Sequence, residues 1–118
     1  MLSLREAQTQ FLVDIARLVL FAAEHPNVAL TAGDFYAQEG HMAKSLHGER
    51  LAADLNLFLL EPHPTEEGRF VWNYIRGDHS FWYTLGAKWK SLHSQNRWGG
   101  DFAKRDWNHF SHTIDKRA

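Results

Sequence analysis

Apolar residues recur at helical spacing near the start of the chain, and a strong helix-start signal precedes them. Ser3 followed by Glu6 forms a capping box, which satisfies free amide groups in the first turn of a helix. Pro26 disfavours the helical conformation in the residue before it. The residues at a spacing of three or four are Leu4, Ala7, Phe11, Ile15, Leu18 and Ala22. The pattern predicts a scaffold helix that ends just before Pro26, with Asp14 outside its apolar stripe.

The pattern changes to a period of two from residue 51 to residue 59. This alternation predicts a strand with leucines on one face and with Asp54 and Asn56 on the other. A helix also fits leucines that lie four residues apart, and the strand is the favoured interpretation. The two prolines at positions 62 and 64 end this element and lead into a loop that reaches Gly68.

The other segments mix short strands, loops and one more helix. We predict a strand over residues 28–31, a loop over 33–44, a short strand or a packed aromatic loop over 70–75, a helix over 81–92, a sharp turn over 98–100 and a strand over 107–112. Helices and short strands in no regular order indicate the α+β fold class.

Length and composition limit the possible functions. The chain has 118 residues, which suits a single domain over positions 1–118, and its 44% hydrophobic content excludes a disordered polymer. The net charge of −1 and the lack of a basic stripe argue against nucleic acid as a partner. The longest apolar stretch, residues 18–23, is too short for membrane insertion. No cleavable signal pattern opens the chain, so synthesis in the cytoplasm is expected.

Eight histidines and no cysteines limit a metal site to imidazole and carboxylate ligands. Asp54 would project from the open face of its strand, and His47 lies on the loop that leads into it. A hydrolytic zinc site uses three protein ligands and a water molecule. The best third candidate is His109, with Asp106 three residues before it; His112 would point to the opposite face of the same strand. Spacing alone does not distinguish this set from ordinary surface or core histidines.

The residues around these positions carry a resemblance to a known family. Ser45, His47 and, after six further residues, Asp54 stand in a segment that is similar to the first metal motif of zinc D-Ala-D-Ala carboxypeptidases and L-alanyl-D-glutamate endopeptidases. The segment that contains Asp106 and His109 resembles the closing motif of that family, in which an acidic residue precedes the last zinc-binding histidine by three positions. The branch that the chain resembles includes small phage lysis enzymes (endolysins).

The resemblance implies a fold, a cofactor and an activity. The fold would be that of the hedgehog and D,D-peptidase group, a small antiparallel sheet flanked by helices. One Zn²⁺ would be held by His47, Asp54 and His109, and Asp106 would act as the general base. The substrate would be the stem peptide of bacterial peptidoglycan, and the favoured reaction is cleavage between L-alanine and D-glutamate. The enzyme is expected to be a monomer that degrades the cell wall after release across the membrane.

Each of three further residues has two possible roles. Ser45 either holds its loop or a zinc ligand in place, or is an ordinary loop residue. Asp101 either orients His109 or caps the turn at residues 98–100, and the turn is favoured. Trp107 lines a substrate groove, or belongs to the core together with Trp98.

One departure from the family concerns recognition of the substrate. Family members often carry an arginine before the first motif, where it can hold a substrate carboxylate, and here that position is Ala37. Arg50 and Arg105 are the nearest cations in sequence to the proposed site. Arg50 is the candidate for substrate binding, and the alternative is a surface residue in a turn.

Three other functions stay open on the sequence alone. The enzyme could be a carboxypeptidase that removes terminal D-alanine. The chain could instead be a non-catalytic zinc- or wall-binding module of the same fold, although Asp106 and all three ligand positions are present. The third alternative is an unrelated α+β domain in which the motifs are coincidental, and the metal content of the purified protein would identify that case.

Overall fold

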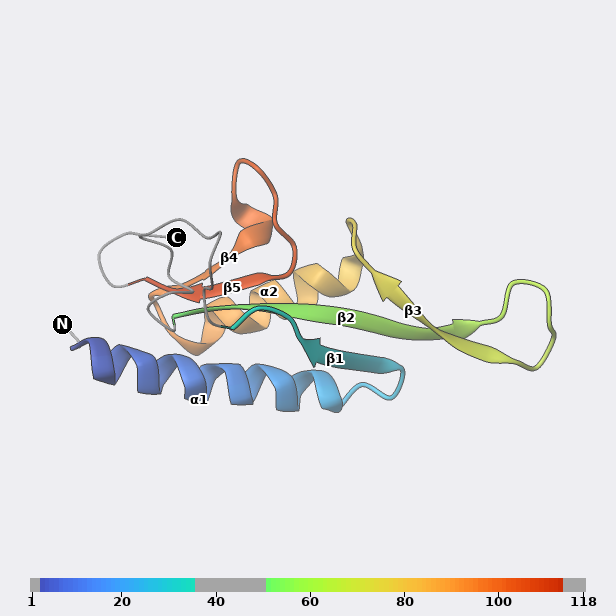
Figure 1. The fold of residues 1–118 in the computed structure, drawn as a ribbon, viewed down its shortest axis with the longest axis horizontal. Helices are drawn as coiled ribbons and strands as arrows, with labels where there is room; N and C mark the ends of the chain where they lie inside the picture. Colours follow the sequence, from blue (N-terminus) through green and yellow to red (C-terminus); the bar gives the residue numbers. More distant parts are fainter. Residues whose placement is uncertain (1–2, 36–50, 114–118) are drawn as a thin grey trace.

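The structure is a computed structural model that describes residues 3–35 and 51–113. In chain order, its elements are α1 (Leu4–Ala23), β1 (Val28–Ala32), β2 (Ala52–Pro62), β3 (Phe70–Ile75), α2 (Ser80–Leu92), β4 (Asn96–Trp98), the 3-10 helix η1 (Gly99–Asp101) and β5 (His109–His112). The two helices and the antiparallel sheet confirm the α+β class (Figure 1). Neither helix in these residues is long and apolar enough to span a membrane.

Strand β2 is the centre of the sheet and has antiparallel neighbours on both edges. β1 pairs along one edge, where Val28 lies opposite Leu59. The other edge is divided: β5 pairs with residues 52–54 of β2, and β3 pairs with residues 57–62. β4 pairs with the outer edge of β5. The first and last parts of the described chain therefore meet on either side of one strand.

The N-terminal helix confirms the prediction from the capping box. The Ser3 hydroxyl accepts a hydrogen bond from the Glu6 amide at 3.2 Å, and the Glu6 carboxylate accepts one from the Ser3 amide at 3.0 Å. The helix ends at Ala23, with Glu24 as its C-cap. The apolar stripe is buried from Ala7 onward, whereas Leu4 is 46% exposed.

Asp14 contradicts the prediction that it lies outside the buried stripe, because it is fully buried. Its carboxylate accepts hydrogen bonds from the amide groups of Gln10 at 2.9 Å and Asn96 at 3.1 Å. A buried carboxylate is tolerated only with such partners. A polar residue of α1 is therefore part of the contact between this helix and β4.

The alternating segment is a strand, as predicted. Leu55 and Leu57 are buried in the core, whereas Asp54 and Asn56 are only partly buried on the other face. The strand continues to Pro62, which pairs with Phe70. The connection that follows contains Gly68 at a φ of 80°, a conformation that favours glycine.

Helix α2 fills the remainder of the core, as its spacing predicted. Leu85 and Trp89 are fully buried, and Phe81 and Leu92 pack against the core at partial burial. The Trp89 indole donates to the carbonyl oxygens of Arg97 at 2.9 Å and Ser111 at 3.1 Å. This shared hydrogen bond fixes the helix to both β4 and β5.

The predicted boundaries differ from the structure near the C-terminal strands. Residues 96–98 form β4, which the sequence did not predict, and the turn expected at 98–100 begins after Trp98 as η1. The last strand begins at His109, two residues later than predicted, because Trp107 and Asn108 form a turn. The structure also assigns residues 70–75 to a strand, which decides between the two alternatives for that segment.

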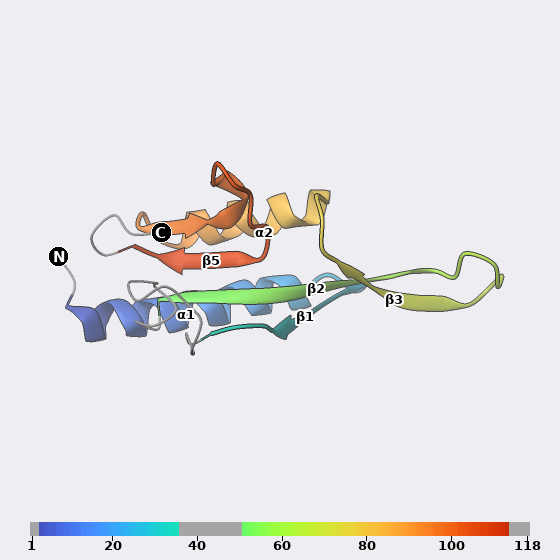
Figure 2. The same ribbon diagram turned by 45° about the horizontal axis from the view of Figure 1, so that its top comes forward.

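The β2–β3 hairpin projects beyond the helices (Figures 1 and 2). Phe70, Trp72 and Tyr74 occupy alternate positions of β3 and are 58%, 50% and 45% exposed. Tyr74 stacks on Phe58 of β2, with 5.1 Å between ring centroids. The hairpin thus presents an aromatic side on the same sheet face as Asp54 and Asn56.

Candidate metal centre

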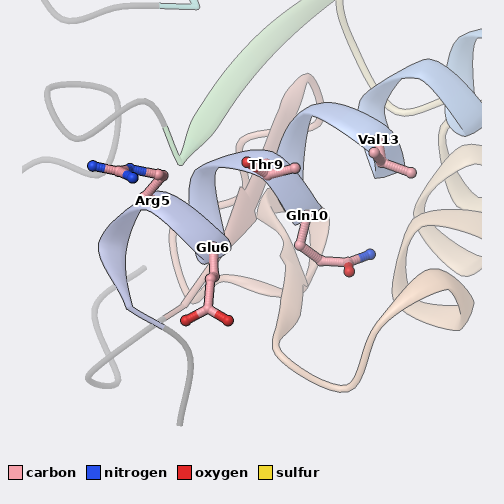
Figure 3. A pocket seen from close by; sticks show the side chains of 5 residues that line it. All are labelled: Arg5, Glu6, Thr9, Gln10 and Val13. Carbon is pink, nitrogen blue, oxygen red and sulfur yellow. The ribbon is translucent and has the colours of Figure 1, made fainter.

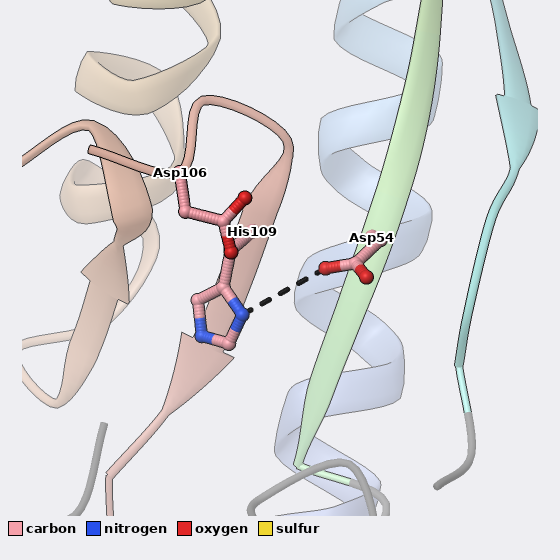
Figure 4. A group of neighbouring side chains, drawn as sticks. All are labelled: Asp54, Asp106 and His109. Atoms are coloured by element: carbon pink, nitrogen blue, oxygen red, sulfur yellow. Dashed lines mark ion pairs between the residues drawn. The ribbon is translucent and has the colours of Figure 1, made fainter. Parts of the chain in front are cut away.

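Asp54 and His109 lie directly opposite each other on β2 and β5. Cross-strand partners project from the same face of a sheet with their side chains in reach of one another. The Nδ1 atom of His109 is 3.7 Å from a carboxylate oxygen of Asp54 (Figure 4). The two proposed ligands therefore converge because of the register between these strands.

Asp106 joins this pair from the turn that precedes β5. Its carbonyl oxygen accepts a hydrogen bond from the His109 amide at 3.1 Å, and its own amide donates to the Gly99 carbonyl at 3.0 Å. One ligand atom from each of Asp54, Asp106 and His109 lies within 4.8 Å of the other two (Figure 4). The structure thus brings together three of the four residues that the sequence assigned to the zinc site and its base.

The close packing at Gly99 explains why a glycine occupies that position. A Cβ atom at residue 99 would lie 2.1 Å from the Asp106 carbonyl oxygen and 2.8 Å from the His109 Cβ. Real Cβ atoms do not approach other heavy atoms this closely. The backbone at Gly99 is therefore the surface on which the Asp106 turn rests.

Trp98 supports the same turn from the core. Its indole ring packs against Gly86 of α2 and Gly100 of η1, where added Cβ atoms would lie 2.3 and 2.2 Å from the ring. Its Nε1 atom donates to the Trp107 carbonyl at 2.8 Å. Trp98 thus belongs to the core, which was one of the two predicted locations. Its hydrogen bond to Trp107 holds the chain two residues before His109.

The solvent exposure of the three residues increases from His109 through Asp54 to Asp106. The side chain of His109 is 9% exposed and that of Asp54 is 24% exposed, whereas Asp106 is an exposed residue. Because Asp106 is at the open end, its carboxylate is accessible to a molecule that approaches from solvent. The two less exposed members, His109 and Asp54, are those expected to bind a metal.

The donor atoms and their spacing fit a divalent cation. An imidazole nitrogen and carboxylate oxygens are ligands that zinc accepts. Two donors at ~2.0–2.1 Å in a tetrahedral arrangement lie roughly 3.3 Å apart. The 3.7 Å between His109 and Asp54 is close to that separation and too long for a hydrogen bond. A cation would also offset the repulsion between the carboxylates of Asp54 and Asp106.

Several predicted site residues lie outside the residues that the structure describes. His47, the third proposed ligand, is among them, as are Ser45 and Arg50. Ala37, which occupies the position of the family arginine, is also in this segment. The roles given to these residues stay predictions.

Asp101, Trp107 and Arg105 have other contacts in the structure. The Asp101 carboxylate accepts a hydrogen bond from Lys90 of α2 at 2.8 Å. Trp107 is half-buried against the core, and the Arg105 guanidinium lies 5.2 Å from the centre of its ring. Arg105 also donates to the Tyr83 hydroxyl at 3.2 Å. These contacts connect η1 and the Asp106 turn to α2.

His112 lies on the core side of β5, opposite to His109. Its Nδ1 atom is 2.9 Å from the Asn96 side-chain oxygen, so it extends the buried polar network of Asp14 and Asn96. Burial lowers the pKa of His112 below its usual 6.5; the positive charge of His93 lowers it further, while Asp14 acts in the opposite direction. This network was not predicted from the sequence, because its members come from three separate elements.

A hollow of about 330 Å³ also lies along α1, away from these residues. Figure 3 shows its lining residues, Arg5, Glu6, Thr9, Gln10 and Val13. All of them come from one helix, and none belongs to the group of Asp54, Asp106 and His109. The candidate metal centre is therefore a separate site, at the junction of β2 and β5.

Comparisons of the chain with protein-family models, curated proteins and solved structures gave no match.

Proposed function

We propose that this protein is a zinc metallopeptidase that hydrolyses a peptide bond in bacterial peptidoglycan stem peptides. The observation that carries the proposal is the convergence of Asp54, Asp106 and His109 at one point of the sheet. Asp54 belongs to one sequence segment, and Asp106 and His109 belong to another that begins about fifty residues later. In the zinc peptidases that these segments resemble, the residues at these three positions are two metal ligands and the general base, and such residues must lie close together.

In the proposed site, Asp54 and His109 bind the metal together with His47, and Asp106 remains unbound as the base. When present, a zinc ion supplies Lewis-acid polarisation of the scissile carbonyl and of the attacking water. The accessible position of Asp106 supports its role, because the base must reach both the water and the substrate.

The proton transfers depend on Asp106 alone. Its carboxylate takes a proton from the water as the new carbon–oxygen bond forms. The same carboxyl group then delivers that proton to the nitrogen of the leaving amine as the carbon–nitrogen bond breaks. Its backbone is held by hydrogen bonds to Gly99 and His109, so the carboxylate is positioned before the substrate arrives.

The favoured bond is that between L-alanine and D-glutamate, as in the phage lysis enzymes that the motifs resemble. The alternative is the terminal D-Ala-D-Ala bond. On either substrate we propose a monomer with one zinc ion that acts on the wall after release across the membrane.

The test compares zinc-loaded wild type with Asp106→Ala on purified peptidoglycan, with the released fragments identified by mass spectrometry. Asp101→Ala is the matched control, because Asp101 is also an exposed aspartate but its carboxylate pairs with Lys90. We expect Asp106→Ala to retain zinc and to lose about 10²- to 10⁴-fold in rate. Asp101→Ala should keep most of the activity.

Two results would reject the proposal, and they differ in meaning. A wild type that binds zinc but releases no fragment would favour the non-catalytic zinc- or wall-binding module. A wild type that binds no zinc would mean that the motifs are coincidental.

A further inference from the structure

A small cavity lies where the edge of β2 passes from β5 to β3. Its volume is about 120 Å³. The lining residues are Leu55, Tyr74, Ile75, Arg76, Trp82 and Asn108. β5 pairs with β2 as far as Asp54, and β3 pairs with it only from Leu57, so the cavity corresponds to the short unshared stretch between them.

This cavity adjoins the candidate metal centre. Leu55 follows Asp54 and Asn108 precedes His109, and the Leu55 amide donates to the Asn108 carbonyl at 3.0 Å, but the Leu55 side chain lies on the core face. The cavity reaches the Asp54 face through Tyr74, whose hydroxyl donates to the Asn56 side chain at 3.2 Å, and through Arg76, which lies over the Tyr74 ring. Two residues of a strand span about 7 Å. A substrate held at Asp54 and His109 could therefore reach the cavity with its next substituent.

Arg76 gives the cavity a positive charge that pairs with no carboxylate among the described residues. Within residues 3–35 and 51–113, no carboxylate lies within ion-pair distance of Arg76. Even Asp78, two residues further along the chain, does not form an ion pair with it. By contrast, Arg69 at the far end of the same hairpin pairs with Glu66. The Arg76 guanidinium lies 5.0 Å from the centre of the Tyr74 ring, a cation–π contact that restrains it beside the opening.

Two neighbouring groups also favour an anion. Asn108 lines the cavity and carries an amide group that can donate hydrogen bonds. Trp82 lies in the first turn of α2, which begins at Ser80, so the N-terminal end of this 13-residue helix borders the cavity. The N-terminus of a helix carries a partial positive charge. The cavity therefore combines a cation, an amide and a helix start beside the proposed reaction centre.

We infer that this cavity binds a carboxylate of the substrate and that Arg76 is the residue that recognises it. The inference rests on the proposed function and identifies a specificity-determining residue within it. In both candidate bonds, the residue that supplies the leaving amine is an amino acid with a free α-carboxylate, either D-glutamate or a terminal D-alanine. That carboxylate is one carbon from the cleaved bond. A volume of 120 Å³ is enough for such a group, since cavities of ~150 Å³ hold benzene.

Arg76 would then perform the task of the arginine that is replaced by Ala37. The sequence pointed to Arg50 and Arg105 because they are nearest to the motifs along the chain. In the structure, Arg105 is engaged with Trp107 and Tyr83. Arg76 lines the cavity from just after the end of β3, a position that no spacing within the motifs could indicate.

The test uses Arg76→Gln, which keeps a polar side chain but removes the charge. Its matched control is Arg69→Gln, on the same hairpin but at a paired arginine. The substrates are two synthetic stem peptides that differ only in whether the carboxylate beside the cleaved bond is free or amidated. We expect wild type and Arg69→Gln to prefer the free carboxylate by about 10- to 100-fold in kcat/KM. In Arg76→Gln this ratio should fall to about one through a loss on the free-carboxylate peptide, with zinc content unchanged.

A ratio that stays at the wild-type value in Arg76→Gln would overturn the inference, as would an equal loss on both peptides. A second measurement separates this result from failure of the proposed function. In NMR titrations with the amine product of each peptide, the Asn108 amide and Trp82 indole signals should move for the free carboxylate and not for its amide. They should not move in Arg76→Gln. If wild type cuts neither peptide but shows these shifts, the anion pocket stands without the peptidase; if the signals do not move, the pocket inference fails.

Discussion

The two halves of β2 differ in their surroundings although they form one continuous strand. In the first half, Ala53, Leu55 and Leu57 are at most 2% exposed and belong to the core with both helices. In the second half, the strand continues into the projecting hairpin (Figure 2), where its partners Trp72 and Tyr74 are about half exposed. The candidate metal centre is on the first half and the aromatic side is on the second.

The difference shows which part of the fold holds its side chains firmly in position. A metal centre needs its ligands held to about 0.5 Å, which packed neighbours can provide. Asp54 has such neighbours, since residues on both edges of β2 pair with it. The aromatic residues of the hairpin contribute less to the core and remain available for contact with other molecules. The Arg76 cavity lies between the two halves. The core residues Leu55 and Trp82 line one part of it, and the end of β3 lines another.

The largest effect should come from the packed half. Trp89→Ala removes a fully buried ring and the indole donor shared by Arg97 and Ser111. We expect a loss of about 3–5 kcal/mol in the free energy of unfolding. Urea denaturation followed by circular dichroism measures it. A loss below about 1 kcal/mol would show that this half is not the stabilising part of the molecule.

A smaller effect on stability, with a larger one on the metal, is expected at the turn. Gly99→Ala places a Cβ atom against the Asp106 carbonyl and the His109 side chain. We expect a loss of about 1–3 kcal/mol in stability, together with weaker zinc binding in calorimetric titration. Gly77→Ala is the control, because a Cβ there meets nothing within 4 Å. Equal zinc affinities in the two variants would contradict the role assigned to Gly99.

The pH dependence of stability should also originate in the packed half. Because the pKa of His112 is lower in the folded state than its usual 6.5, the unfolded chain binds the proton more tightly. The contribution of neutral His112 is therefore complete above pH 6.5 and is lost as the pH falls from 6.5 through the folded-state pKa.

Urea denaturation of the metal-free protein between pH 7.5 and pH 5 measures this loss. His112→Gln should flatten the profile. A profile that is the same in His112→Gln and wild type would assign the pH dependence to other groups.

The smallest effect is expected on the projecting half. Trp72→Ala removes a ring that is 50% exposed and outside the core, so the free energy of unfolding should change by less than about 0.5 kcal/mol. Zinc affinity should also stay the same. If this variant were destabilised as much as Trp89→Ala, the contrast between the two halves of β2 would not hold.

The sequence predicted those elements whose signals are local. The capping box at Ser3 and the alternation around Asp54 each concern neighbouring residues, and both α1 and β2 formed as expected. β4 was not predicted, because a three-residue strand depends on its partner β5 more than on its own pattern. The burial of Asp14 was missed for a related reason, since its partner Asn96 is 82 residues away.

The candidate site was predicted in part for the same physical reason. Asp54, Asp106 and His109 stand in two compact motifs, and the resemblance of these motifs to those of a zinc peptidase family predicted that the three converge. Arg76 stands in neither motif. Its place beside the site depends on where β3 stops relative to β5 along β2, which is set by pairing across the sheet. The ion pair of Asp101 with Lys90 could not be predicted either, because it depends on how α2 packs beside η1.

The pairing of Asp14 with Asn96 also has a consequence for the order in which the chain folds. Asp14 is synthesised before its buried hydrogen-bond partner Asn96, which follows 82 residues later. Burial of the carboxylate without that partner is unfavourable, so α1 cannot dock in its final position until β4 has been made. Contacts of such long sequence separation slow folding. Until β4 has been made, we expect the apolar stripe of α1 to lack its final cover, a state that favours binding of the nascent chain by chaperones.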